Sequence, residues 1–145
     1  MIQTGDTYFR EYYVSFTDSD HLPWLWRLFT RKGFEHCSVY MATGQDSCIS
    51  VCQTMFDVVI TTYPHNVHIV ADALVESGGS TVVYVPHARL KMAKLRLGVL
   101  IPTCVSLCQR LTGLTFHAFT PYYYYRALLS RGCHELKGKN HGRNV

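Results

Sequence analysis

The sequence predicts an α+β domain in which a mostly antiparallel sheet is flanked by helices. Short runs rich in β-branched and aromatic residues, separated by turn residues, predict strands. Helix-like segments with capping residues lie between some of these runs. Strands and helices do not alternate regularly, however, as a parallel sheet would require. The chain has 145 residues and is 48% hydrophobic, which is enough for one domain with one core.

A strand and a helix are expected first. The run Tyr12–Phe16 is rich in strand formers and is followed by turn residues. The segment Pro23–Gly33 has proline near its start, cations in its last turn and glycine at its end, a pattern that indicates a helix. Its apolar residues include Trp24 and Trp26. We expect this helix to pack its tryptophans on the core.

Two strand-like runs, residues 34–43 and 47–55, surround a turn at Gly44-Gln45 and predict a hairpin. If the hairpin is symmetric about that turn, His36 lies opposite Gln53, and Cys37 lies opposite Cys52 on the other face. A slip of one residue would move His36 to the other face, so this expectation depends on the register.

The remaining elements follow from similar signals. Residues 56–63 and 81–85 are rich in β-branched residues and predict two more strands. Residues 67–77 carry an apolar stripe after Asn66, a good helix N-cap, and predict a helix between those strands. A last helix is expected over residues 122–131.

Residues 102–113 predict the cysteine-bearing helix of the domain. Pro102 suits a first helical position, and Gly113 suits a left-handed end. Cys104 then lies in the opening turn, where unpaired N–H groups and the helix dipole favour thiolate over thiol. Cys108, one turn further along, is expected to be a small buried apolar residue. A nucleophilic cysteine needs a histidine within reach, and His36 is the candidate.

These segments together resemble a known family. The resemblance rests on Gly33-Phe34-Glu35-His36-Cys37 entering a strand, Thr103-Cys104-Val105 opening a helix that ends in Leu111-Thr112-Gly113, and Thr120-Pro121 before the last helix. This layout resembles the NlpC-like papain-fold cysteine hydrolases, and more closely their circularly permuted branch, in which histidine precedes cysteine. Small proteins of tailed bacteriophages have a similar layout. The resemblance spans roughly residues 10–132.

The resemblance implies a papain-like thiol hydrolase, a peptidase or amidase. Cys104 would be the nucleophile, His36 the base, and Gln53 the polar group that orients the imidazole. The Cys104 backbone N–H would be one oxyanion donor. The substrate would be a peptide or a peptidoglycan-like molecule with an amide bond, or else an ester or thioester. No cofactor is implied.

Two alternatives compete with this interpretation. The same fold could be catalytically inactive and serve as a phage structural or binding protein. The histidines and the six cysteines could instead bind zinc, for instance through the pairs Cys48/Cys52 and Cys104/Cys108. Both pairs fall within predicted regular elements rather than in tight turns, which argues against zinc.

Charge and termini limit the partners that we expect. The net charge is +4, and the stretch 88–96 carries four basic residues and no acidic one. This stretch is either a solvated face or a contact for an acidic partner, and it does not favour nucleic acid. The basic residues are Arg89, Lys91, Lys94 and Arg96.

No membrane span or signal peptide is indicated. We expect a domain over residues 1–132, a flexible basic tail over 133–145, free thiols, and a location in the bacterial cytoplasm or the virion.

Overall fold

The computed structural model describes residues 11–20, 24–54, 57–86, 103–114 and 117–138. Within these residues the strands are β1 (Glu11–Thr17), β2 (His36–Ala42), β3 (Cys48–Gln53), β4 (Val58–Tyr63), β5 (Ser80–Pro86) and β6 (His134–Glu135). The helices are α1 (Trp24–Arg27), α2 (Val67–Glu76), α3 (Cys104–Thr112) and α4 (Pro121–Ser130).

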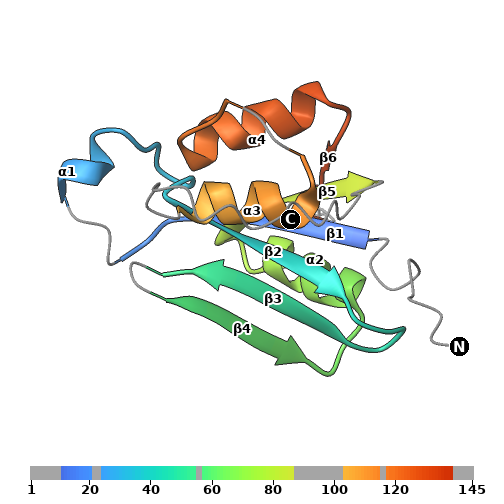
Figure 1. Ribbon diagram of the computed structural model, residues 1–145. Coiled ribbons are helices and arrows are strands. Elements are labelled where there is room, and N and C mark those ends of the chain that lie inside the picture. Colours follow the sequence, from blue (N-terminus) through green and yellow to red (C-terminus); the bar gives the residue numbers. More distant parts are fainter. Residues whose placement is uncertain (1–10, 21–23, 55–56, 87–102, 115–116, 139–145) are drawn as a thin grey trace, which may run out of the picture.

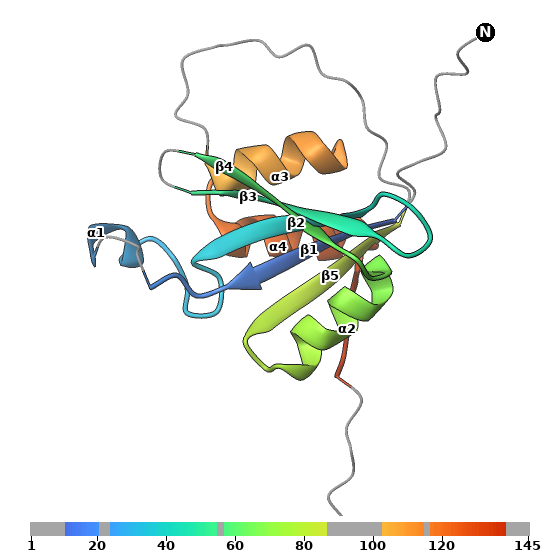
Figure 2. The ribbon, with the colours of Figure 1, turned by 90° about the horizontal axis from the view of Figure 1, so that it is seen from below.

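The strands form one antiparallel sheet in the order β4-β3-β2-β1-β5-β6. Helices α3 and α4 lie on one face of this sheet and α2 lies on the other (Figures 1 and 2). Helix α3 packs mainly against β2, whereas α2 packs mainly against β5. The predicted α+β class and the antiparallel sheet are therefore confirmed.

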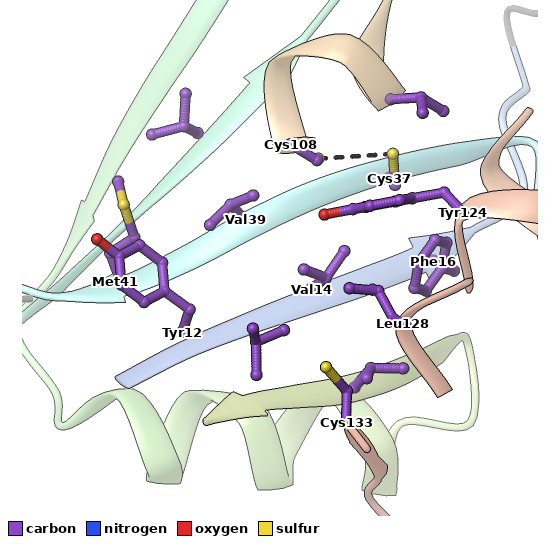
Figure 3. Packing of buried hydrophobic residues seen from close by; sticks show 14 residues of the cluster. Tyr12, Val14, Phe16, Cys37, Val39, Met41, Cys108, Tyr124, Leu128 and Cys133 are labelled. Carbon is purple, nitrogen blue, oxygen red and sulfur yellow. Dashed lines mark hydrogen bonds between the residues drawn. The ribbon is translucent and has the colours of Figure 1, made fainter. Parts of the chain in front are cut away.

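Side-chain alternation divides the buried residues between the two faces. In β1, Tyr12, Val14 and Phe16 face α3 and α4, whereas Tyr13 faces α2. All five central residues of β1 are buried because the strand has neighbours on both sides and helices on both faces. Figure 3 shows the larger of the two clusters, in which Leu128 of α4 packs over β1.

The predicted helix caps are confirmed where the structure describes them. The Asn66 side chain accepts a hydrogen bond from the N–H of His68 at the start of α2. The Thr120 side chain accepts one from the N–H of Tyr123, and Pro121 is the first residue of α4. Each cap satisfies one of the N–H groups that a helix start leaves unpaired.

The expected hairpin register is wrong by one residue. Ser38 lies opposite Cys52, and Ala42 lies opposite Cys48, so the hairpin is centred on Gln45 rather than between Gly44 and Gln45. The cause is a three-residue loop closed by the N–H of Thr43, which donates to the Ser47 carbonyl at 3.0 Å, and by contact between their hydroxyls at 2.9 Å. This register places Cys52, and not Gln53, on the face of His36.

The expectation of a long helix with buried tryptophans over 23–33 is also wrong. Helix α1 has four residues and none of them is buried. The chain turns back at Arg31, whose carbonyl accepts the N–H of Phe34 at 2.8 Å. Phe34, near the end of this connection, packs among the aromatic rings of Phe16 and Tyr125. Because α3 and α4 already cover that face of the sheet, the tryptophans remain outside.

After α4 the chain joins the sheet, so residues 133–138 do not form the start of the expected flexible tail. Gly132 adopts a positive φ of 82° at the end of α4 and redirects the chain toward β5. Cys133 is buried, and β6 pairs with Val83 and Tyr84 of β5. Residues 139–145 and the basic stretch 88–96 lie outside the described residues. Among the described helices, none is long and apolar enough to cross a membrane.

A pair of leucines tests this packing. Leu128 is fully buried, whereas Leu28 is 70% exposed. Leu128→Ala should reduce the free energy of unfolding by about 2–5 kcal/mol because it leaves a cavity between α4 and the sheet. Leu28→Ala should change it by less than about 0.5 kcal/mol. Urea denaturation of both variants measures the difference, and equal losses would show that the segment that follows α1 is packed after all.

Candidate active site

Cys104 is the first residue of α3 and is fixed there by a capping box. The Thr103 side chain accepts the N–H of Ser106, and the Ser106 hydroxyl accepts the N–H of Thr103. The first intrahelical hydrogen bond runs from the N–H of Leu107 to the Thr103 carbonyl, at 3.0 Å. The N–H of Cys104 therefore has no partner inside the helix, and the positive end of the helix lies at its thiol. The predicted place of Cys104 in the opening turn is confirmed.

Cys37 lies beneath the first turn of α3. Its sulfur is 3.5 Å from that of Cys108, and both residues are 1% exposed (Figure 3). The Cys37 thiol also lies near Cys104 and lowers the pKa of that cysteine. Burial raises the pKa of Cys37 well above its usual value, so its thiol keeps its proton and can donate it. The prediction that Cys108 is a buried apolar residue is confirmed.

His36 is the first residue of β2 and contacts sulfurs on two different elements. Its Nε2 lies 3.0 Å from the sulfur of Cys52 on β3. The Cys104 side chain, at the start of α3, is near enough to the ring to raise the pKa of His36. The structure therefore brings the two main predicted residues, Cys104 and His36, into contact.

The electrostatics of this contact favour an ion pair. The hydrogen bond from the Cys37 thiol, followed by that from the His36 ring, lowers the pKa of Cys104 to about 5 in spite of burial. The hydrogen bond with Cys104, followed by that with Cys52, raises the pKa of His36 to about 10. Between these two values Cys104 is a thiolate and His36 is an imidazolium.

Cys52 is the contact that the sequence interpretation missed. The hydrogen bond with His36 lowers its pKa, as it does for Cys104. Cys104 has a second donor in Cys37 and the helix dipole as well, so it is the sulfur that carries the negative charge. A prediction that centred the hairpin on Gln45 would have placed Cys52 on the face of His36. The signal for that centre is the pair Thr43 and Ser47, whose hydroxyls can form a hydrogen bond across a three-residue loop.

Gln53 does not contact His36 in the described structure. Strand alternation places it with Val51, on the face that α3 covers. It is 7% exposed, and its Oε1 has no hydrogen-bond partner among the described residues. Cys52, and not Gln53, is therefore the β3 side chain that forms a hydrogen bond with the His36 ring.

The sulfur-rich site does not have the arrangement of a metal centre. Among the described residues, no group of three or more histidine, cysteine or acidic side chains is placed to hold a metal ion. Of the cysteines proposed as zinc ligands, Cys48 belongs to the α2 side of the sheet and Cys104 to the α3 side.

Comparison with known proteins leaves this geometry as the main guide to function. No family model, no curated protein and no solved structure matches the chain.

The lowered pKa of Cys104 predicts an unusual pH dependence of alkylation. Reaction of Cys104 with iodoacetamide should have its midpoint near pH 5, because the rate falls only when the thiolate is protonated below its pKa. Cys133, whose pKa is raised by burial, should react much more slowly at neutral pH. His36→Ala should move the Cys104 midpoint upward, since it removes one of the stabilising hydrogen bonds. Peptide mapping across pH measures these rates.

The matched control for this experiment is His134→Ala, which removes an exposed histidine on β6. It should leave the Cys104 midpoint unchanged. A midpoint near the ordinary value for cysteine, about pH 8.5, would contradict the ion pair.

Proposed function

We propose that this protein is a thiol hydrolase, a peptidase or amidase, with Cys104 as nucleophile and His36 as general base and acid. The observation that carries the proposal is the placement of Cys104 at the start of α3 near His36 at the start of β2, where each side chain shifts the pKa of the other toward a thiolate–imidazolium pair. A half-buried cysteine at a helix start with such a partner is the arrangement that nucleophilic catalysis requires.

In the acylation step, the Cys104 thiolate attacks the carbonyl carbon of the substrate and forms a C–S bond. The carbonyl electron pair moves to oxygen, and the free N–H of Cys104 stabilises that oxyanion. The oxyanion then collapses, the His36 imidazolium gives its proton to the leaving nitrogen, and the C–N bond breaks. The products of this step are a free amine and an acyl thioester on Cys104.

In the deacylation step, neutral His36 takes a proton from water as the water oxygen attacks the thioester carbonyl. The C–S bond breaks, and Cys104 leaves as thiolate beside the regenerated imidazolium. The carboxylic acid is released, and the ion pair returns to its starting state. An ester or thioester substrate would follow the same steps with a different leaving atom.

Cys52 holds the imidazole in this mechanism. Its contact with Nε2 of His36, at 3.0 Å, fixes the orientation of the imidazole ring. Ser38, opposite Cys52 across the hairpin, in turn forms a hydrogen bond with Cys52. Cys52 is thus a positioning residue, which acts through His36 rather than on the substrate.

The papain-like fold of the permuted NlpC type is part of the proposal. It is supported by the motif resemblance, by a histidine at the start of a strand, and by a cysteine at the start of a helix on that sheet. This assignment suggests a peptide or peptidoglycan-like substrate and a phage or bacterial setting.

Acyl transfer from p-nitrophenyl acetate tests the catalytic pair. The wild-type protein should form an acetyl thioester on Cys104, visible by mass spectrometry, and should turn it over. Cys104→Ser should abolish the adduct, and His36→Ala should slow turnover by about 10²–10⁴-fold, the usual contribution of general acid–base catalysis. His134→Ala should have no effect. Turnover that survives Cys104→Ser would overturn the proposal, and a Cys104 that never acylates would indicate an inactive, binding protein.

Substitutions at Cys52 and at Gln53 show which of these two residues orients His36. Cys52→Ala should lower kcat by about tenfold and move the alkaline limb of the pH profile to lower pH, because His36 loses the Nε2 partner that raises its pKa. Cys52→Ser, which keeps a hydrogen-bonding group, should retain more of the activity. Gln53→Ala should leave the pH profile unchanged. The reverse order of effects would return the orienting role to Gln53.

A further inference from the structure

The connection between β1 and β2 exposes an unusual amount of apolar surface. Of the eleven large apolar side chains exposed in the described part of the chain, five fall between residues 24 and 29. They are Trp24, Leu25, Trp26, Leu28 and Phe29, with exposed fractions of 53–75%. We call residues 24–32 the apolar tip. A contiguous apolar cluster of this kind marks a surface that meets another phase or molecule.

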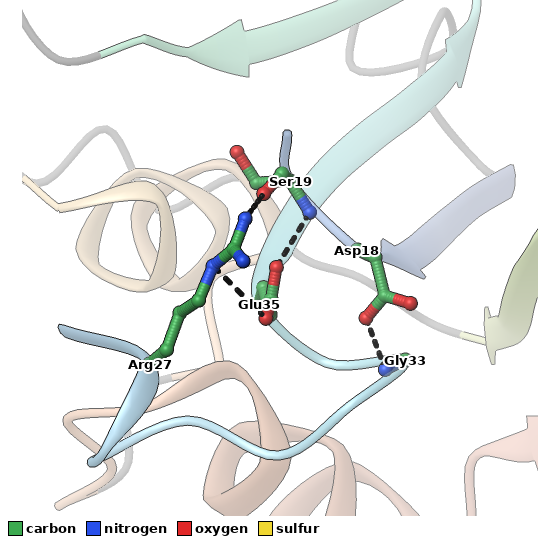
Figure 4. A network of polar contacts seen from close by, with 5 residues as sticks. All are labelled: Asp18, Ser19, Arg27, Gly33 and Glu35. Atoms are coloured by element: carbon green, nitrogen blue, oxygen red, sulfur yellow. Dashed lines mark hydrogen bonds and ion pairs between the residues drawn. The ribbon is translucent and has the colours of Figure 1, made fainter. Parts of the chain in front are cut away.

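The tip is held away from the core by a polar network at its base (Figure 4). The Glu35 carboxylate accepts the N–H of Ser19 at 2.9 Å and pairs with Arg27 at 3.9 Å. The Asp18 carboxylate accepts the N–H of Gly33. These bonds join the two ends of the connection, so the exposure of the tip is part of the folded structure.

The distribution of the apolar side chains identifies the kind of partner. A protein groove covers one stripe of a helix, with anchors three or four residues apart. Here consecutive residues Trp24, Leu25 and Trp26 are all exposed, and they point to several sides of a one-turn helix. A partner that can contact the tip from several sides at once, as a lipid phase can, therefore fits these side chains better than a protein groove does.

The charges of the tip match an anionic surface. Residues 24–32 contain three cations and no acidic residue. The Arg31 guanidinium stacks over the Tyr122 ring at 4.5 Å, which leaves the exposed Lys32 as its most accessible cation. Tryptophan side chains favour the interface between lipid tails and water, and lysine favours anionic headgroups.

We propose that the apolar tip inserts into the interface of an anionic lipid bilayer and docks the protein there. This inference is independent of the proposed hydrolase activity. Since the tip leads directly into β2, docking would hold His36 and Cys104 near the bilayer surface (Figure 1).

The chain carries a built-in reporter for this proposal, because its only two tryptophans are Trp24 and Trp26. Full-length protein is mixed with vesicles of phosphatidylcholine alone or of phosphatidylcholine with phosphatidylglycerol. Tryptophan emission should shift to the blue, and the protein should sediment with the vesicles, much more strongly when phosphatidylglycerol is present. Lys32→Gln should weaken binding to the anionic vesicles by roughly fivefold.

Leu28→Ser/Phe29→Ser keeps both tryptophans and should reduce vesicle binding by about tenfold or more, through lost apolar burial. The matched control is Val59→Ser/Ile60→Ser, which changes two exposed residues of β4 and should bind as wild type. Thermal unfolding of both variants checks that they fold.

Three results would overturn the proposal. The first is the absence of any blue shift with anionic vesicles. The second is emission that is already blue without lipid and depends on protein concentration, which would make a second copy of the chain the partner. The third is binding unaffected by Leu28→Ser/Phe29→Ser, which would assign attraction to another region, such as the basic stretch 88–96.

Discussion

The meeting of the start of β2 with the start of α3 is the contact on which the proposed chemistry depends. His36 and Cys104 are far apart in sequence, and they come together where the first residue of β2 meets the first residue of α3, the helix that packs against β2. Cys37, the next residue of β2, faces α3 and contacts the sulfurs of both Cys104 and Cys108, one helical turn apart. The core contact and the site contact are therefore adjacent, and the packing of α3 sets the geometry of the site.

The neighbouring sulfurs of Cys37 and Cys104 differ in protonation state because their surroundings differ. Cys37 is fully enclosed, so its thiol stays neutral and donates a hydrogen bond to Cys104. Cys104 is half-buried, and the helix start, a thiol donor and an imidazole all stabilise its anion. The site thus keeps a thiolate in a largely apolar setting because every favourable group points at one sulfur.

Much of the fold could be predicted from the sequence, because its signals are local. Alternating β-branched runs indicated most of the strands, and Asn66 and Thr120 marked the starts of two helices. The start of α3 was expected at Pro102, whereas Thr103 is its N-cap. Strand β6 was missed because two residues carry no pattern, and their pairing depends on the free edge of β5. The exposure of Trp24 and Trp26 could not be predicted from local sequence either, because other segments occupy the core position that their helix would have taken.

The candidate site was predictable in its two main residues and not in the third. Cys104 and His36 were identified by their places at element starts, which sequence signals define well. The third residue depends on where the β2–β3 loop is centred. The loop is centred on Gln45 rather than between Gly44 and Gln45, which shifts the strand pairing by one residue and places Cys52 instead of Gln53 on the face of His36. Side-chain bonding across a short loop, as between Thr43 and Ser47, decides such cases.

The protonation state of His36 tests the central claim most directly. An NMR titration that follows the ring nitrogens of His36 would measure it. The ion pair with Cys104 predicts an imidazolium that persists through neutral pH and loses its proton only near pH 10, and a fall of that midpoint in Cys104→Ser. A His36 that titrates near its ordinary value of about 6.5, with no response to Cys104→Ser, would contradict the account.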